Sequence, residues 1–311
     1  MPSRRNFLRQ TAFASAALIS SKSVLGKVYA EDPVERLIIL HTNDTHSRLE
    51  PFPMDGGRNQ GLGGIAARAG LIKKIRSEEN NVLLLDAGDI FQGTPFFNIY
   101  KGEPEIKAMT AMGYDAVTMG NHDFDAGLEN FVTQMRHANF RTINCNYDFT
   151  NTPMEFKYRP YKIFRKGKLK IGITAVGIEL SGLVPENLYG NTRYLDPVQR
   201  ANQVSYMLKK EEGCDMVICL SHLGYRYKDN KVSDEILAKE SEHIDLIIGG
   251  HTHTFMEKPE VFINKKGQDV VVNQVGWAGL ILGRLDFEFS GYKKKELAKT
   301  HTVIVGKKTN E

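Results

Sequence analysis

The sequence has few cysteines and no long apolar run. Its 311 residues include three cysteines, Cys145, Cys214 and Cys219, which are too few and too irregularly spaced for a disulfide framework. Cys214 and Cys219 flank the apolar run 216–218, so we expect them to lie beside a buried strand without a chemical role. No apolar run reaches the roughly 18 residues of a membrane-spanning helix, which excludes a multi-spanning membrane protein. Hydrophobic residues at 41% and charged residues at 25% are typical of a globular chain.

The excess of positive charge is confined to the start of the sequence. The chain has 41 basic and 37 acidic residues, and residues 1–30 hold no acid and five of the bases, Arg4, Arg5, Arg9, Lys22 and Lys27. Without those five, 36 bases face 37 acids. A body this close to neutral does not support a nucleic-acid-binding surface.

Residues 1–30 resemble an export signal. The segment 3–9 is similar to the twin-arginine pattern, an apolar stretch follows over 11–19, and Val28 and Ala30 are small residues at the positions that a signal peptidase reads. The alternative is a short amphipathic helix or a basic terminus without this role. We therefore expect a twin-arginine-type signal peptide over 1–30, a catalytic domain over 31–311, and a periplasmic or secreted location.

After residue 30, apolar runs alternate with amphipathic stretches, as in α/β proteins. Buried strands are predicted at 37–40, 82–85, 116–118, 141–144, 216–220 and 244–248, and helices at 63–77, 105–112, 128–138 and 197–212. The runs 161–164 and 169–176 predict a hairpin that turns at Gly167. Residues 179–195 are expected to form a loop, the runs 261–263, 270–275 and 281–289 an antiparallel meander, and the lysine-rich tail over 293–308 a solvated end.

Polar clusters follow five of the predicted strands, at the point where each strand ends. They are Asp44 with His46, Asp89, Asn121 with His122, His222, and His251 with His253, and they contain five of the nine histidines. Each cluster alone is a weak signal, because Asp-x-His and Gly-Asp are common sequences. Since open α/β sheets bind ligands at the carboxyl ends of their strands, we expect these clusters to meet at one site.

The residue types in these clusters indicate a metal site. Carboxylate, imidazole and amide donors without cysteine suit a borderline-hard transition metal, and Mn, Zn, Fe and Co all tolerate them. His251 and His253, two residues apart after a Gly-Gly pair, can reach two neighbouring ions. This favours a centre of two divalent metal ions about 3.5–4 Å apart, the kind used in phosphoryl displacement.

These motifs carry a resemblance to a known family. Asp44-Thr45-His46, Gly88-Asp89, Gly120-Asn121-His122-Asp123, Ser221-His222 and Gly250-His251-Thr252-His253 occur in the order found in calcineurin-like metallophosphoesterases. The flanking segments 88–93 and 121–125 are similar to the metallophosphatase domain of bacterial and animal 5′-nucleotidases. The resemblance covers about residues 36–290 and implies an α/β fold, a four-layer αββα sandwich of two mixed β-sheets flanked by helices.

The resemblance also implies a role for each residue. One metal would bind Asp44, His46 and His253, the other would bind Asn121, His222 and His251, and Asp89 would bridge the two ions. A carboxylate between two dications offsets their repulsion. A hydroxide shared by the ions would be the nucleophile. His122 would protonate the leaving oxygen and Asp125 would orient it, although an acid at position 125 also fits the start of a helix. Asp123 is expected to be a supporting residue.

The sequence therefore predicts an exported dinuclear-metal phosphatase that hydrolyses phosphomonoesters, 5′-nucleotides above all, without a nucleic-acid partner. Full-length 5′-nucleotidases carry a second, nucleoside-binding domain, and this sequence ends at Glu311. One alternative is therefore a catalytic-type subunit that works with a separate nucleoside-binding chain. Cyclic-nucleotide phosphodiesterase, nucleotide-sugar hydrolase and thiosulfohydrolase activities are further alternatives within the family. Trp277 and the segment 183–194 are expected either to line the mouth of the site or to pack as ordinary structural residues.

Overall fold

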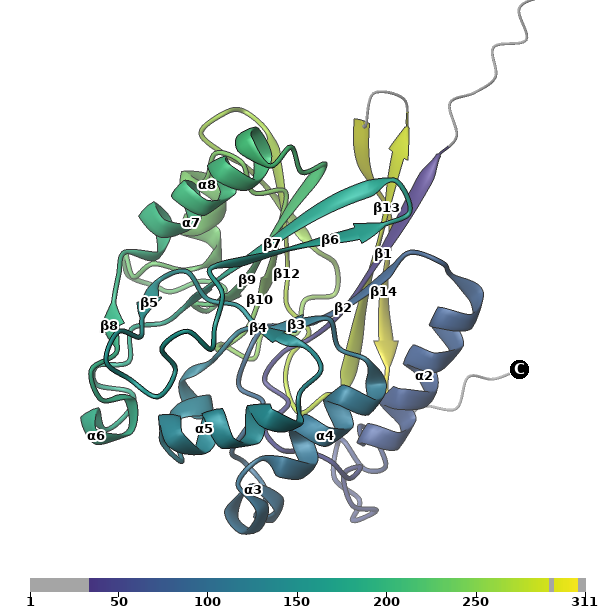
Figure 1. Ribbon diagram of the computed structural model, residues 1–311. Helices are drawn as coiled ribbons and strands as arrows, with labels where there is room; N and C mark the ends of the chain where they lie inside the picture. Colours follow the sequence, from purple (N-terminus) through teal and green to yellow (C-terminus); the bar gives the residue numbers. More distant parts are fainter. Residues whose placement is uncertain (1–33, 291–293, 307–311) are drawn as a thin grey trace, which may run out of the picture. The chain divides into compact units, whose positions relative to one another are not determined.

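Two six-stranded sheets form the centre of the protein (Figure 1). The structure, a computed structural model, describes residues 34–290 and 294–306. The first sheet has the strand order β14-β13-β1-β2-β3-β4. Its strands are β1 (Glu35–Thr42), β2 (Val82–Asp86), β3 (Ala116–Val117), β4 (Arg141–Thr142), β13 (Ile281–Ser290) and β14 (Lys294–Ile304). The strands β1 to β4 are parallel, whereas β13 runs antiparallel to β1 and to β14, so the sheet is mixed.

The second sheet has the order β11-β12-β10-β9-β7-β6 and is mixed in the same way. Its strands are β6 (Tyr161–Lys166), β7 (Leu169–Gly177), β9 (Met216–His222), β10 (Leu246–Gly249), β11 (Glu260–Ile263) and β12 (Asp269–Asn273). The four inner strands are parallel, and the edge strands β6 and β11 are antiparallel to their neighbours. A short pair, β5 (Tyr147–Asp148) with β8 (Arg193–Tyr194), lies outside both sheets.

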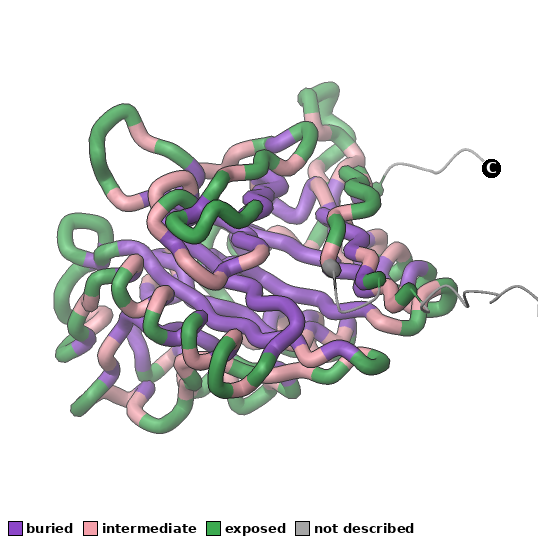
Figure 2. The backbone as a smooth tube through the Cα atoms, turned by 90° about the horizontal axis from the view of Figure 1, so that it is seen from above, coloured by how far each residue is buried: buried purple, intermediate pink, exposed green. Residues whose placement is uncertain are grey.

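The alternation of side chains along the strands places each sheet between two apolar layers. In β1, Leu37 and Ile39 pack between the sheets, whereas Ile38 and Leu40 belong to the cluster under the first group of helices. Those helices are α2 (Ile65–Glu78), α3 (Pro95–Tyr100), α4 (Glu103–Met112) and α5 (Leu128–Gln134). The outer face of the second sheet packs on α7 (Pro197–Tyr206) and α8 (Asp234–Glu240). Figure 2 shows the buried strands in the interior, with exposed residues around them. The four-layer prediction is confirmed.

The lysine-rich tail differs from its prediction. Residues 294–304 form β14, which pairs with β13 along its whole length, and are not a solvated end. Lys295 is only 19% exposed, and its Nζ lies 2.5 Å from Asp245 Oδ1, a residue just before β10. The lysines do not predict a strand, because β14 is held by its pairing with β13 and by the Lys295–Asp245 ion pair. Neither interaction can be read from the local sequence.

Three further predictions are corrected. The segment 179–195 contains the short helix α6 (Glu186–Tyr189) and the strand β8, and is not a plain loop. The runs 261–263, 270–275 and 281–289 do not form one meander, because β11 and β12 belong to the second sheet and β13 to the first. The predicted helix 128–138 ends as α5 at Gln134 and continues as a single 3₁₀ turn, η3 (Met135–His137).

The remaining sequence expectations concern the hairpin, the cysteines, the N-terminal segment and membrane-spanning helices. The hairpin of β6 and β7 turns at Gly167, whose φ of 57° is in the left-handed region that favours glycine. All three cysteines are free and buried, and burial raises the pKa of each thiol. The predicted signal segment 1–30 lies outside the described residues, and the single domain over 31–311 stays a prediction. None of the described helices is both long and apolar enough to cross a membrane.

Candidate metal centre

The predicted site residues lie at the carboxyl ends of strands from both sheets. Asp44 and His46 follow β1, Asp89 follows β2, and His222 is the last residue of β9. Asn121 and His122 begin the 3₁₀ helix η2 (Asn121–Phe124) after β3, and His251 and His253 follow β10. Because the parallel strands of each sheet end on the same side, residues as far apart in sequence as His46 and His253, 207 positions, meet here.

Asp44, His46 and His253 form the first of two donor groups. Each offers one donor atom, and these atoms lie within 4.8 Å of one another. The two Nε2 atoms of His46 and His253 are 2.9 Å apart, and Asp44 Oδ1 lies 3.5 Å from His253 Nε2. The Asp44 carboxylate is fully buried, whereas the His253 side chain is 41% exposed. The group is therefore open to solvent on the side of His253.

Asp89, His222 and His251 form the second group, with the same spread of donor atoms. Asn121 joins them, because its Oδ1 lies 2.9 Å from His251 Nδ1. Asp89 also reaches the first group: its Oδ2 is 3.1 Å from His222 Nε2 and 3.8 Å from His46 Nε2. The structure thus brings all seven predicted donors together and places Asp89 between the two groups.

Hydrogen bonds to the backbone orient the imidazoles. His222 Nδ1 lies 2.7 Å from the carbonyl oxygen of Ala87, and His46 Nδ1 lies 3.3 Å from that of Phe91. A ring nitrogen that faces a carbonyl carries a proton, so in both residues Nε2 is the nitrogen that is directed at the site. The fully buried His222 Nε2 has no hydrogen-bond partner among the described residues.

The backbone is strained at most of the donors. Asp44, His46, Asp89, His251 and His253 all have φ between 47° and 73°. Non-glycine residues in this left-handed region cost about 1–3 kcal/mol each and concentrate at functional sites. Glycine is required beside them, because a Cβ on Gly120 would lie 2.1 Å from Asp89 Oδ1. The strained backbone therefore lowers the stability of these loops, and it positions the donor side chains at the site.

Asp123 holds two of the loops together. Its buried carboxylate accepts hydrogen bonds from the N–H groups of Asp89, Ile90 and Phe91 after β2, and from that of Gly120 after β3, at 2.8–3.1 Å. The side chain is saturated by these four donors and belongs to neither donor group. This arrangement agrees with the supporting role expected for Asp123.

Two buried residues at the site were not identified from the sequence. Asn43 Nδ2 donates to Asp44 Oδ2 at 2.6 Å, and Asn43 Oδ1 accepts from Val275 N–H. Gln274 Oε1 accepts from Thr254 N–H, and its Nε2 donates to Gly250 O, so this side chain spans the loop that carries His251 and His253. Both residues directly follow a strand and are polar, so the strand-end rule could have found them.

The carboxylates and imidazoles of the site shift one another's pKa. Burial disfavours a proton on His222, but the nearby carboxylates of Asp89 and Asp44 outweigh burial and raise the pKa of His222 to about 10. For Asp89, burial opposes ionisation, yet His222 and His46 lower the pKa of its carboxyl below the ordinary value. Burial lowers the pKa of His251 to about 4, which keeps its ring neutral. The carboxylates of Asp89 and Asp44 thus stabilise a positive charge on the buried ring of His222.

The donor set fits a pair of divalent metal ions. Two carboxylates, four imidazoles and one amide oxygen supply hard and borderline donors without thiolate. The buried Nε2 of His222 and the close pair of His46 and His253 nitrogens are positions where a metal ion would replace the ring protons. The described residues therefore provide two candidate metal-ligand groups, and the ligand roles themselves stay predictions.

His122 and Asp125 form a separate pair at the edge of the donor groups. His122 Nδ1 lies 2.8 Å from Asp125 Oδ2, and the histidine side chain is 38% exposed. The hydrogen bond with Asp125 raises the pKa of His122. Asp125 is the C-cap residue of the 3₁₀ helix η2, whereas α5 begins only at Leu128 with Gly127 as its N-cap. Asp125 is therefore not at the start of α5, and its carboxylate is hydrogen-bonded to His122.

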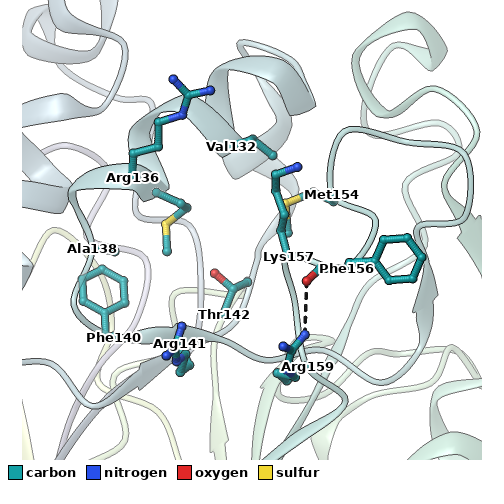
Figure 3. Close-up of a pocket in the computed structure, with 11 residues that line it drawn as sticks. Val132, Arg136, Ala138, Phe140, Arg141, Thr142, Met154, Phe156, Lys157 and Arg159 are labelled. Atoms are coloured by element: carbon teal, nitrogen blue, oxygen red, sulfur yellow. Dashed lines mark hydrogen bonds between the residues drawn. The ribbon is translucent and has the colours of Figure 1, made fainter.

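Cavities lie both beside the site and away from it. A cavity of about 290 Å³, shown in Figure 3, is lined by residues of α5, of the segment 135–142 that contains η3 and β4, and of the segment 154–159, and by none of the seven donors. A cavity of about 320 Å³ includes Tyr194 of the segment 183–194, together with Leu223, the neighbour of His222. Trp277 stacks on His253, with ring centroids 5.8 Å apart, and lines a third cavity of about 250 Å³.

Paired donor groups at the strand ends of two packed, mixed sheets define an α/β protein with a candidate dinuclear metal site. The sequence matches the calcineurin-like phosphoesterase family over residues 37–255. This chain belongs to that family.

Relatives with named activities support a narrower comparison. A snake venom 5′-nucleotidase of Gloydius brevicauda is 30% identical over 295 residues, which are 88% of this chain and 49% of the relative. The 5′-nucleotidase of Vibrio cholerae is 33% identical over 305 residues, which are 88% of this chain and 53% of the relative. The chain thus spans about half the length of the curated relatives it matches.

Solved structures agree with this comparison. A 5′-nucleotidase precursor from Thermus thermophilus superposes with a TM-score of 0.77 at 30% identity, covering 87% of this chain and 55% of that one. The calcineurin-like phosphoesterase YfkN from Bacillus subtilis superposes with a TM-score of 0.69 at 26% identity and covers 88% and 91% of the two chains. The fold inferred from the sequence is therefore that of its relatives.

Proposed function

We propose that this protein is an exported metal-dependent phosphatase that hydrolyses phosphomonoesters, with 5′-nucleotides as its principal substrates. The observation that carries the proposal is the convergence of seven oxygen and nitrogen donors in two groups beside the partly exposed His122–Asp125 pair. The relatives named above, 5′-nucleotidases from snake venom and bacteria, support the choice of nucleotides.

The cofactor in this proposal is a pair of divalent ions, Mn, Zn, Fe or Co. Asp44, His46 and His253 would hold one ion, Asn121, His222 and His251 would hold the other, and Asp89 would contact both. When bound, such a pair supplies Lewis-acid chemistry: it polarises phosphoryl oxygens and lowers the pKa of water toward neutrality.

The protein's own residues orient the substrate and move a proton. Asp125 accepts the hydrogen bond from His122 Nδ1, so Nε2 is the nitrogen that faces outward. The raised pKa keeps a proton on the ring at higher pH than an isolated histidine would. We propose that His122 Nε2–H protonates the leaving oxygen of the ester and that Asp125 fixes the ring for this transfer.

The export part of the proposal depends on the sequence of residues 1–30. Its Arg4–Arg5 pair, apolar stretch and small residues before position 31 favour twin-arginine export to the periplasm or the medium. Such export carries folded proteins, so a metal could bind before the chain crosses the membrane.

A substrate panel with matched variants tests the proposal. We expect the purified protein with Mn²⁺ to hydrolyse p-nitrophenyl phosphate and adenosine 5′-phosphate. His46→Ala should lose bound metal and activity, and His137→Ala, a change of an exposed histidine outside the site, should lose neither. The absence of both bound metal and turnover in the wild-type protein would contradict the proposal.

The same panel distinguishes the alternatives. Turnover of cyclic nucleotides or nucleotide sugars without turnover of monoesters would assign a different phosphoester class to this site. Activity that appears only after a separate nucleoside-binding chain is added would identify the protein as a catalytic-type subunit.

A further inference from the structure

A cavity next to the donor groups has the chemistry of a ring-binding site. It has a volume of about 250 Å³, and its walls are the aromatic rings of Trp277 and Phe255 and several aliphatic side chains, including Ile304. Arg58 and Asn59 supply the polar groups of its lining, and no acidic residue lines it. Phe255 is 48% exposed and Ile304 is 39% exposed, so the cavity opens to the surface.

Trp277 belongs both to this cavity and to the surroundings of the metal groups. Its ring lies parallel to that of His253, with an interplanar angle of 10° and centroids 5.8 Å apart. The next residue, Ala278, donates its N–H to the carbonyl oxygen of Asp44 at 2.7 Å. The Trp277 wall of the cavity therefore contacts His253 directly, on the side where His253 is exposed, and the next residue along the chain is bonded to Asp44.

The position of Trp277 is fixed by its neighbours. Phe52 meets its ring edge to face, with centroids 5.9 Å apart. The preceding residues are tied to the loops of the site, because Val275 N–H bonds Asn43 Oδ1 and Gly276 N–H bonds the carbonyl oxygen of Thr254. Because the Trp277 side chain is already ordered, the binding of a ring does not carry the entropic cost of ordering it.

The lining selects one class of ligand. Aromatic and aliphatic walls favour a flat apolar face, and an arginine and an asparagine can hydrogen-bond to polar atoms at the edge of a ring. The volume lies just below the range of about 300–1,000 Å³ that is typical of pockets for drug-sized ligands, so it suits one ring system. A heteroaromatic ring such as a nucleobase has these properties.

We infer that this cavity binds the aromatic ring of a phosphoester whose phosphate lies at the two donor groups. The inference rests on the proposed phosphatase activity and adds the location of the residues that select the organic group. Trp277 and Phe255 would contact the faces of the ring, and Arg58 and Asn59 would contact its polar edge.

The sequence provides a direct probe of this site, because Trp277 is the only tryptophan of the chain. Adenosine, which has the ring but no phosphate, is titrated into the full-length protein while tryptophan fluorescence is recorded. We expect a saturable change in fluorescence, and Trp277→Phe should abolish the signal. The measurement needs no turnover and is therefore independent of catalysis.

Two variants test the location. We expect Phe255→Ala and Ile304→Ala each to weaken adenosine binding, by about tenfold for the loss of the aromatic wall. The ratio of kcat/KM for adenosine 5′-phosphate to that for glycerol phosphate should fall with it. Phe156→Ala, a matched change of an exposed phenylalanine at the cavity of Figure 3, should leave both quantities unchanged.

The possible outcomes separate this inference from the proposed function. An unchanged fluorescence on adding adenosine, or equal affinity in the wild type and both cavity variants, would overturn the inference. If Phe255→Ala fails to fold, Ile304→Ala alone decides. Adenosine binding without hydrolysis of any ester would support the ring site and overturn the phosphatase proposal. Hydrolysis of glycerol phosphate without adenosine binding would support the phosphatase proposal and overturn the ring site.

Discussion

His122 differs from the other histidines of the site because it belongs to neither donor group and has a carboxylate partner of its own. We expect His122→Ala to keep the metal content of the wild type, since no donor is removed. Turnover of alkyl phosphates should fall by about 10²–10⁴, the usual contribution of general acid catalysis. Turnover of p-nitrophenyl phosphate should fall much less, because its leaving group needs little protonation.

The measurement compares kcat for the two substrate types and metal content by elemental analysis, in the wild type and in His122→Ala. Equal, small losses on aryl and alkyl phosphates would show that His122 is not the acid. His137→Ala is the matched histidine control.

A second prediction at the residue scale concerns Asp234, which is buried at the start of α8. Ser221 Oγ donates to Asp234 Oδ1 at 2.5 Å, and Oδ2 has no hydrogen-bond partner among the described residues. Burial raises the pKa of this carboxyl from 3.8 to about 8. Between these two values the folded state keeps a proton that the unfolded state has lost, so the free energy of unfolding falls as the pH rises.

Asp234→Asn removes this titration and keeps an acceptor for Ser221. We expect the variant to gain stability relative to the wild type by at most about 1.4 kcal/mol per pH unit across that window. Urea unfolding at the acidic and alkaline ends of the window measures the effect. A difference between the two proteins that does not vary with pH would disprove the prediction.

At the scale of elements, the turn between β3 and η2 must carry glycine at position 120. A Cβ there would lie 2.1 Å from Asp89 Oδ1 and 2.6 Å from His222 Cε1. We expect Gly120→Ala to displace both donors, to lose metal and activity, and to destabilise the fold by about 1–3 kcal/mol, as overpacking does.

Gly70→Ala is the matched control. Gly70 lies within α2, and nothing is within 4 Å of a Cβ at this position, so alanine should stabilise the helix by roughly 0.5–1 kcal/mol. Metal content and thermal unfolding distinguish the two variants. Retention of metal by Gly120→Ala would show that the close contact is relieved without moving the donors.

The elements that could be predicted from the sequence are those whose pattern is local. Continuous apolar runs located β1, β2, β9 and β10, because strands buried on both faces need apolar side chains throughout. The helix α3 has six residues with no apolar period, and β14 is defined by its pairing with β13. The helix α8 does carry a local signal, because Ser233 caps it by accepting a hydrogen bond from Ile236 N–H.

The candidate site was predictable for a related reason. Strand ends are visible in the sequence, so the sequence pattern alone is enough to name all seven donors. The hydrogen bonds of Asn43, Gln274 and Asp123 join segments that are distant in sequence, and their function as supports depends on the packing of the loops. The cavity beside Trp277 is formed by residues from position 58 to 304, a combination that no sequence pattern reveals.

At the scale of the whole molecule, the folded chain concentrates negative charge where solvent cannot reach it. Asp44 and Asp89 are 0% and 1% exposed, and both lie within 4 Å of His222 Nε2. Burial of two carboxylates is costly unless cations compensate them. Five donors also occupy the left-handed backbone region, which adds to the cost of the apo fold.

Ions that bind only the folded state should therefore raise its stability markedly. We expect Mn²⁺ at a thousandfold excess over its Kd to stabilise the protein by about 4 kcal/mol. Treatment with a chelator should lower the Tm, and added Mn²⁺ should restore it. Asp89→Asn should gain less from Mn²⁺ than the wild type, because it lacks the donor shared by both groups, whereas Asp55→Asn in an exposed loop should gain the same. If the Tm of the wild type does not respond to Mn²⁺, the two groups do not bind metal in the folded protein, and the strain at their backbone requires another explanation.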